Sequence, residues 1–132
     1  MTVDTIERLK RASKQPQRAI RSSDNKPTRY YSTKQEKAVA ENLNGKRQPN
    51  SGATMFAKSD VVLEDFSIEC KTKTKPSDSI SIKKEWLTKI NEEALFTGKK
   101  YGALIFNFGD CSNYVIIDEG TFKTLLESQK SS

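Results

Sequence analysis

The chain has 132 residues, of which 34% are hydrophobic, and it carries a formal net charge of +6. This length suits one domain with one modest core, and no apolar run reaches the about 18 residues that a membrane-spanning helix requires. Because the sequence contains no histidine, it excludes histidine general bases, histidine metal ligands and Ser-His-Asp triads. We expect a cytoplasmic protein, or one of the host-cell cytoplasm if its source is a virus, because the N-terminal residues lack an apolar signal core.

The first 29 residues are the most basic part of the chain. They contain eight Lys or Arg against three Asp or Glu, whereas the other residues contain 15 Lys or Arg against 14 Asp or Glu. We predict that residues 1–29 form a mostly flexible arm and that residues 30–132 form the folded domain. Such an arm either contacts nucleic-acid phosphates, with Arg18, Arg21 and Arg29 as candidates, or is a solvated tail.

The first half of the domain predicts one helix and two short strands. Ser32 or Thr33 is a candidate cap for the helix, and Asn44-Gly45 is a stop signal. The strands are indicated by short runs of β-branched and aromatic residues between turn signals. In chain order, we expect a helix over 30–45, a loop over 46–58, strands over Asp60–Leu63 and Phe66–Lys71, and a polar loop over 72–79.

The second half of the domain predicts a helix, two strands and a last helix. Ile82, Trp86, Ile90 and Ala94 recur every four residues and indicate the buried stripe of a helix, which faces either the core or a dimer partner. The elements expected are a helix over Lys83–Phe96, a buried central strand over 101–108, a strand over 114–118 and a helix that starts near Asp118. The fold class is therefore α/β, with helices flanking a small mixed sheet.

The chain has two cysteines, Cys70 and Cys111. Their separation fits no paired-cysteine zinc motif. In a cytoplasmic protein, we expect both of them to be reduced residues of the core.

An unusual group of charges lies on the first two predicted strands. Because side chains alternate along a strand, Glu69 and Lys71 point to the same face of the sheet. If Glu64-Asp65 forms a two-residue turn, counting back along the hairpin places Asp60 directly opposite Glu69. Side chains opposed in this way are close neighbours, so the two carboxylates repel each other and one pKa rises.

A divalent cation between the two carboxylates relieves this repulsion, and hard oxygen ligands favour Mg²⁺, with Mn²⁺ as a substitute. An adjacent lysine can stabilise the negative charge that develops on a phosphate during attack. The pattern of Asp60, Glu69 and Lys71 therefore indicates metal-dependent phosphodiester hydrolysis. The alternative is a solvated strand face that carries ordinary surface charges.

At these residues, the sequence resembles the PD-(D/E)xK nuclease superfamily, although Ser59 stands where the motif usually has proline. It is most similar to the archaeal-type Holliday-junction resolvases, in which a basic residue, a proline and a Ser-Gly pair precede the metal site. The matching residues are Arg47-Gln48-Pro49-Asn50-Ser51-Gly52, Asp60-Val61 and Glu69-Cys70-Lys71. That family also has a glutamate on its first helix, for which Glu36 is the better match and Glu41 the second candidate.

The resemblance implies a restriction-endonuclease-like fold and a homodimer that cuts four-way DNA junctions with Mg²⁺. It implies metal ligands at Glu36, Asp60 and Glu69, completed by the backbone carbonyl of Cys70. It also implies that Lys71 assists the attack and that Ser51 lies near the scissile phosphate.

Further basic residues lie close to the motif in the sequence and are either plain surface or phosphate contacts. They are Arg47, Lys73, Lys75, Lys83 and Lys84. We expect Trp86 to be packed rather than stacked on a base. Two alternative functions remain open, namely a restriction- or repair-type endonuclease that acts on duplex or flap DNA, and a non-catalytic DNA-binding protein on the same scaffold.

Overall fold

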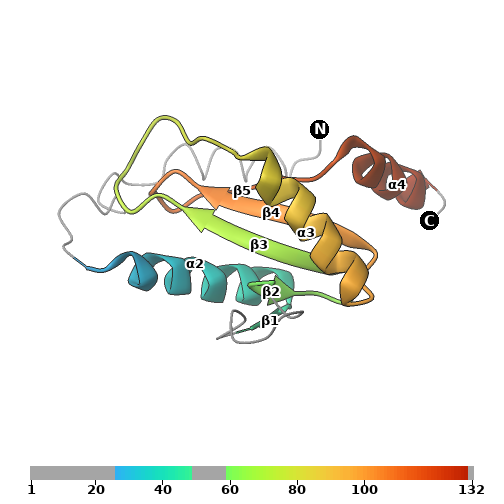
Figure 1. Ribbon diagram of the computed structural model, residues 1–132, viewed down its shortest axis with the longest axis horizontal. Coiled ribbons are helices and arrows are strands. Elements are labelled where there is room, and N and C mark those ends of the chain that lie inside the picture. Colours follow the sequence, from blue (N-terminus) through green and yellow to red (C-terminus); the bar gives the residue numbers. More distant parts are fainter. Residues whose placement is uncertain (1–25, 49–58, 131–132) are drawn as a thin grey trace.

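The computed structural model describes residues 26–48 and 59–130 (Figure 1). Most of the predicted basic arm, with Arg18 and Arg21, and the segment that contains Ser51 lie outside the described residues. The described elements are α2 (Thr28–Leu43), β1 (Lys46–Arg47), β2 (Val61–Val62), β3 (Phe66–Thr72), α3 (Lys84–Phe96), β4 (Tyr101–Asn107), β5 (Asn113–Ile116) and α4 (Glu119–Lys130).

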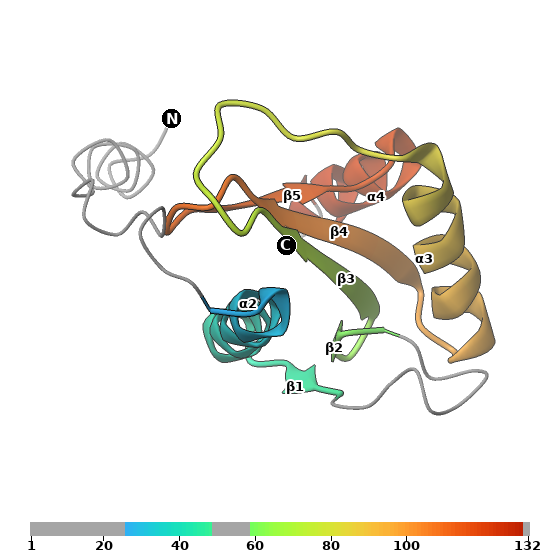
Figure 2. The same cartoon turned by 60° about the vertical axis from the view of Figure 1, so that its left-hand side comes forward.

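The five strands form one mixed sheet in the order β1-β2-β3-β4-β5. Strands β3 and β4 are parallel, and every other neighbouring pair is antiparallel. A parallel pair needs a crossover connection, and α3 provides it. Helix α2 lies over one face of the sheet and α3 over the other, as Figure 2 shows. The predicted α/β fold, with a mixed sheet flanked by helices, is confirmed.

The main hydrophobic core lies between α2 and the sheet. Val39 of α2 packs there against residues of three strands, and the members of this cluster are Val39, Val61, Ile68, Cys70, Ala103 and Ile105. Because Ile68 and Cys70 of β3 face α2, the intervening side chain of Glu69 points to the opposite face. Core packing on one face of β3 therefore fixes which face carries the charged residues.

On the other face, α3 lies close to β4. Ile90 and Ala94 of α3 are buried, as the predicted stripe requires. Gly102 of β4 permits this close approach, because a Cβ atom at this position would lie 2.9 Å from the carbonyl oxygen of Ile90. Any side chain at residue 102 would push α3 away from the sheet, so this glycine sets the distance between α3 and the neighbouring strands.

Two local predictions for the first helix region are wrong. Helix α2 begins at Thr28, directly after Pro27, and neither Ser32 nor Thr33 caps it. The hydroxyl of Ser32 instead donates to the carbonyl of Thr28, one turn back within the helix. Residues 46–47 were expected in a loop, but they form β1 because their backbone pairs with β2. The predicted stop is confirmed, since Asn44 has a left-handed conformation with φ of 55°.

The two cysteines have different environments. Cys70 is buried in the core, as expected, whereas Cys111 is exposed on the turn between β4 and β5, so the prediction for Cys111 is wrong. Neither of them forms a disulfide. Within the described part of the chain, no helix is both long and apolar enough to cross a membrane.

Helix α4 follows β5 and begins with a side-chain cap. The side chain of Asp118 accepts a hydrogen bond from the backbone N–H of Thr121 at 2.7 Å, which caps the helix near the predicted start. Figure 1 shows α4 projecting beyond the end of the sheet. Its large apolar side chains Phe122, Leu125 and Leu126 are exposed. The apolar stripe of α4 is therefore not used in the core of this chain.

Candidate active site

The hairpin of β2 and β3 has the register that places Asp60 opposite Glu69. Val61 pairs with Ile68 and Val62 with Ser67. One residue before β2, the backbone N–H of Asp60 donates to the carbonyl of Ile68 at 2.9 Å. The predicted hairpin register is confirmed, and it brings the carboxylate of Asp60, just before β2, close to that of Glu69 on β3.

The carboxylate of Asp60 is bound to the backbone of β3. Its Oδ2 atom accepts a hydrogen bond from the N–H of Cys70 at 2.8 Å. Burial raises the pKa of Asp60, and the Cys70 N–H and the nearby Lys71 ammonium only partly oppose this effect. Asp60 is therefore held in a fixed position, in surroundings that favour additional positive charge.

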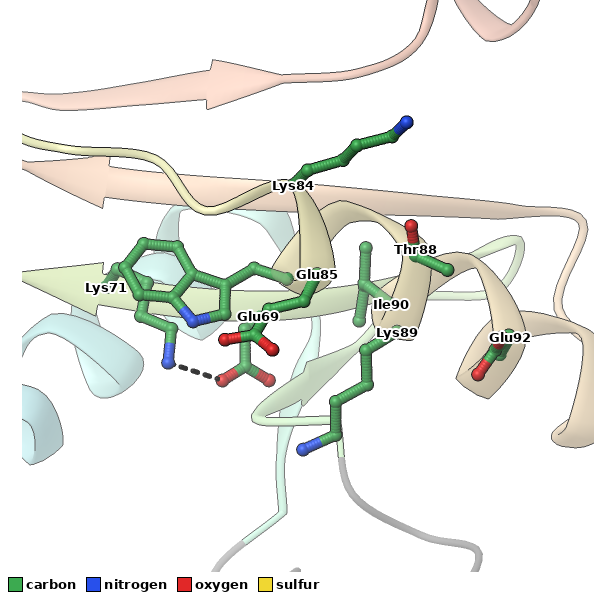
Figure 3. A pocket seen from close by; sticks show the side chains of 9 residues that line it. Glu69, Lys71, Lys84, Glu85, Thr88, Lys89, Ile90 and Glu92 are labelled. Carbon is green, nitrogen blue, oxygen red and sulfur yellow. Dashed lines mark ion pairs between the residues drawn. The ribbon is translucent and has the colours of Figure 1, made fainter.

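Glu69 and Lys71 face each other on the same side of β3. The Nζ atom of Lys71 lies 3.4 Å from Oε1 of Glu69 (Figure 3). Burial, then repulsion from Asp60, raises the pKa of Glu69 to about 7, and the attraction of Lys71 lowers it only in part. One lysine therefore does not compensate the two opposed carboxylates.

The third candidate carboxylate comes from α2. The Oε1 atom of Glu36 accepts a hydrogen bond from Nε of Arg47 at 3.1 Å. Burial and then the charge of Asp60 raise the pKa of Glu36, and Arg47 opposes this rise. Glu36 is thus close enough to Asp60 for the two negative charges to repel each other. Glu41, the second helix candidate, is exposed, so the structure favours Glu36.

The same carboxylates act on the thiol of Cys70. Burial, together with the charges of Asp60, Glu36 and Glu69, raises the pKa of this thiol. A thiol of this kind stays protonated and unreactive at neutral pH. Cys70 can therefore contribute to the site through its backbone groups but not through its thiol.

A buried glutamine, which the sequence analysis did not single out, supports the site from α2. Gln35 is only 6% exposed. Its Nε2 donates to the carbonyl oxygen of Lys71 at 2.9 Å and to Oδ1 of Asn113 at 3.2 Å. The sequence holds a signal for this role, because Tyr31, Gln35 and Val39 recur every four residues and are the buried residues of α2.

A cavity of about 720 Å³ opens beside the charged side chains, between β3 and α3. Side chains from β3 and α3 line it, and these are Glu69, Lys71, Lys84, Glu85, Trp86, Thr88, Lys89, Ile90 and Glu92 (Figure 3). Trp86 is half-buried in this wall, and Nζ of Lys71 lies 4.5 Å from the centre of its ring. Trp86 is thus packed, as expected, but against a charged side chain at the cavity.

The remaining basic candidates lie at different places relative to this cavity. Lys84 lines it, and Nζ of Lys83 is 5.8 Å from the centre of the Trp86 ring. Lys73 and Lys75 lie on the connection between β3 and α3, and Arg29 lies in the first turn of α2, which makes Arg29 part of the helix rather than of the arm. Lys71 and Lys83 therefore both lie near the Trp86 ring, whereas the side chain of Lys84 points away from Lys71 (Figure 3).

The donor atoms fit a hard divalent cation in their chemistry, because carboxylates and a backbone carbonyl are the ligands that Mg²⁺ prefers. Two of the three carboxylates bind other side chains, since Glu36 binds Arg47 and Glu69 binds Lys71. Within the residues that the structure describes, no three Asp, Glu, Cys or His side chains converge as a ready metal cage. The pair that fits best is Asp60 and Glu69, whose repulsion a cation would relieve.

In comparisons with known proteins, no protein-family model, curated protein or solved structure matches this chain. The function of this chain is therefore inferred from the residues of the site. The α/β fold only places the site, because similar folds host many unrelated activities.

Proposed function

We propose that this chain is a metal-dependent DNA endonuclease that hydrolyses phosphodiester bonds in four-way junctions and acts as a homodimer. One observation carries the proposal. Asp60 lies opposite Glu69 in the confirmed register, and the ammonium of Lys71 lies 3.4 Å from the Glu69 carboxylate. Two carboxylates whose pKa values are both raised by burial, that of Glu69 also by the charge of Asp60, lie beside a lysine in the wall of an open cavity. This arrangement suits a metal-dependent hydrolase acting on a phosphate.

Each of these residues has one task in the proposed reaction. Asp60, Glu69 and the backbone carbonyl of Cys70 would hold Mg²⁺, with Glu36 as a further ligand once it is released from Arg47. When bound, Mg²⁺ supplies charge stabilisation at the phosphate and activation of the attacking water. The ammonium of Lys71 stabilises the negative charge that develops on the phosphate oxygens.

DNA binding in this proposal depends on the phosphate backbone. Phosphate contacts position a protein on DNA without reading sequence, which suits an enzyme that selects a branched structure. The candidates are Arg18, Arg21, Arg29, Arg47, Lys73, Lys75, Lys83 and Lys84. The resemblance also implies a place for Ser51 near the scissile phosphate, and Ser51 lies outside the described residues.

One observation favours a second function, that of a non-catalytic DNA-binding protein. The ion pairs of Glu36 with Arg47 and of Glu69 with Lys71 neutralise two of the three carboxylates without any metal. A protein that only binds DNA would use these pairs to stabilise its fold. The two functions differ in whether bound DNA is cut.

The deciding experiment compares four-way junctions, flaps and linear duplexes of matched sequence, each with Mg²⁺, Ca²⁺ or EDTA. We expect junction cleavage with Mg²⁺ only, and its loss in Asp60→Asn, which keeps an acceptor for the Cys70 N–H. Asp65→Asn, in the turn of the same hairpin, is the matched control. Cleavage of flaps or duplexes instead would indicate a restriction- or repair-type enzyme, and binding without cleavage would indicate the non-catalytic protein.

A further inference from the structure

The ammonium group of Lys71 lies between a carboxylate and an aromatic ring. Its Nζ atom is 3.4 Å from Oε1 of Glu69 and 4.5 Å from the centre of the Trp86 ring. Both distances fall within the ranges of an ion pair and a cation–π interaction. Two side chains from different elements, β3 and α3, therefore hold one lysine.

The backbone of Lys71 is also fixed. Its carbonyl oxygen accepts a hydrogen bond from Gln35, and the residue pairs with Phe106 in the parallel ladder of β3 and β4. A lysine side chain still has a long flexible stem, and its ammonium takes many positions unless something holds it. The position of the charge is therefore decided by Glu69 and Trp86.

These two contacts respond differently to a cation at the carboxylates. A metal ion bound by Asp60 and Glu69 neutralises the charge that attracts Lys71, and it also repels the ammonium directly. An indole ring attracts a cation through its quadrupole, and a metal ion at the carboxylates does not neutralise this attraction. If a metal ion occupied the carboxylates, the ring of Trp86 would therefore still hold Lys71, even where Glu69 no longer did.

We propose that Trp86 is a positioning residue, which keeps the ammonium of Lys71 beside Asp60 and Glu69 through contact with the face of its ring. The proposal rests on the proposed nuclease function for its catalytic consequence, but the contact itself is independent of that function. Trp86 is not a member of the main core cluster, and its half-buried ring lines the cavity. Indole is also the aromatic side chain that binds cations most strongly.

The helix that carries the ring of Trp86 is held in place by its own packing. The backbone N–H of Trp86 donates to the carbonyl of Lys83 at 3.0 Å in the first turn of α3. One turn further on, Ile90 is buried, and α3 approaches β4 closely at Gly102. The helix that carries the ring is thus anchored to the sheet that carries the lysine. Lys83 is also near the ring, but at the longer distance of 5.8 Å, which makes it a matched control.

The first test uses the full chain without metal or DNA. Because the sequence contains a single tryptophan, its fluorescence reports on Trp86 alone. We expect Lys71→Met to change the emission maximum or yield more than Lys83→Met does. In NMR spectra, the εCH₂ signal of Lys71 should be shifted by the ring current, and this shift should disappear in Trp86→Leu. Emission that responds equally to both lysine variants, or an unshifted Lys71 signal, would overturn the proposal.

The second test measures single-turnover junction cleavage with Mg²⁺. Removal of the cation–π interaction predicts a roughly 3- to 30-fold slower rate for Trp86→Leu, a smaller effect for Trp86→Phe, and junction affinity in Ca²⁺ within about twofold of the wild type. Equal cleavage rates for the wild type and Trp86→Leu would overturn the catalytic consequence. If Trp86→Leu does not fold, Trp86→Phe decides, and the rate must still fall. If the wild type cuts no DNA, the proposed nuclease function fails, while the fluorescence and NMR results still decide whether Trp86 positions Lys71.

Discussion

The side-chain amide of Gln35 donates a hydrogen bond to the main-chain carbonyl of Lys71 at 2.9 Å. The same amide nitrogen donates to Asn113 on β5, so a single buried group connects α2 with two strands of the sheet. Glu36 follows Gln35 in the helix, and its carboxylate lies within the field of Asp60. The hydrogen bond of Gln35 therefore joins β3, which carries Lys71, to α2, which carries Glu36.

We predict that Gln35→Met destabilises the fold by about 1–3 kcal/mol, because methionine has a similar shape but cannot donate to the partly buried carbonyl of Lys71. The free energy of unfolding, measured with urea, checks this value. Lys37→Met, which changes an exposed residue of the same helix, is the control and should have little effect. A Gln35→Met protein as stable as the wild type would show that another donor satisfies the carbonyl of Lys71.

The contrast between Gln35 and Asp60 shows what the sequence can predict. The pairing of Asp60 with Glu69 follows from alternation along a strand and a count across a tight turn, both of which are local. The hydrogen bond of Gln35 joins residues 36 positions apart, and its existence depends on how α2 packs. Periodicity indicates that residue 35 is buried, but it does not indicate the partner.

Two further features depend on packing in the same way. The contact of Lys71 with Trp86 arises because α3 crosses the sheet where Gly102 leaves room. The exposure of Cys111 follows from its place on a turn, whereas Cys70 is buried because it alternates with Glu69 on a central strand. Residue type alone predicts the same environment for both cysteines. Position within the sheet decides between them.

The second prediction separates the two helix glutamates. Glu36→Gln should slow junction cleavage by about 10- to 100-fold, which is a typical effect of removing a group that supports a metal site. Glu41→Gln should cleave at the rate of the wild type, because Glu41 is exposed. Single-turnover rates with Mg²⁺, with junction affinity measured in Ca²⁺, compare the two variants. A larger decrease in the cleavage rate for Glu41→Gln would show that Glu41, and not Glu36, supplies the helix carboxylate of the site.

The third prediction concerns the stability of the metal-free protein as a function of pH. The folded protein keeps a proton on Glu69 up to about pH 7, whereas the unfolded chain loses it near the ordinary value of 4.5. The raised pKa therefore contributes stability that is fully present below pH 4.5 and is lost as the pH rises through about 7. The raised pKa values of Asp60 and Glu36 act in the same direction.

Urea unfolding in EDTA at pH 5 and pH 8 measures this effect. We expect the free energy of unfolding of the wild type to fall by about 1–3 kcal/mol from pH 5 to pH 8. The decrease should be smaller for Glu69→Gln, because glutamine does not become charged as the pH rises. Glu64→Gln, an exposed residue of the same hairpin, is the matched control and should behave like the wild type. A stability that rises with pH in the wild type would refute the assigned direction of the pKa shift.

The fourth prediction concerns the basic N-terminal segment. Deletion of residues 1–25 removes six Lys or Arg but leaves α2 intact. Junction affinity should fall, and the dependence of log K on log salt should become shallower by up to about 0.9 for each phosphate that the shortened chain no longer neutralises. Junctions of unrelated sequence should show the same decrease in affinity, because phosphate contacts carry no base information. An unchanged salt slope would mean that the segment does not bind DNA.

The last prediction concerns assembly. A four-way junction presents two symmetric strands to cut, and residues 26–48 and 59–130 form one candidate site. Resolution therefore requires two copies, most simply related by a twofold axis. Such an interface needs an apolar, self-complementary surface. Helix α4 offers Phe122, which is 54% exposed, and Leu126, which is 42% exposed, and β5, the strand before it, has the exposed Val115. On α3, the exposed large apolar residues are Leu95 and Phe96, at the end remote from Trp86.

Light scattering at micromolar concentration should therefore report about twice the chain mass of 14.9 kDa. Phe122→Glu should return the mass to that of one chain, because a buried unpaired carboxylate opposes association. Thr124→Glu adds the same charge to the same helix outside the apolar stripe and should leave the dimer intact. Since each site lies on its own subunit, Phe122→Glu should still nick a junction once but should no longer cut both strands in one binding event. A wild-type monomer that makes both cuts in one event would defeat the dimer and would favour an enzyme that acts on flaps or duplexes.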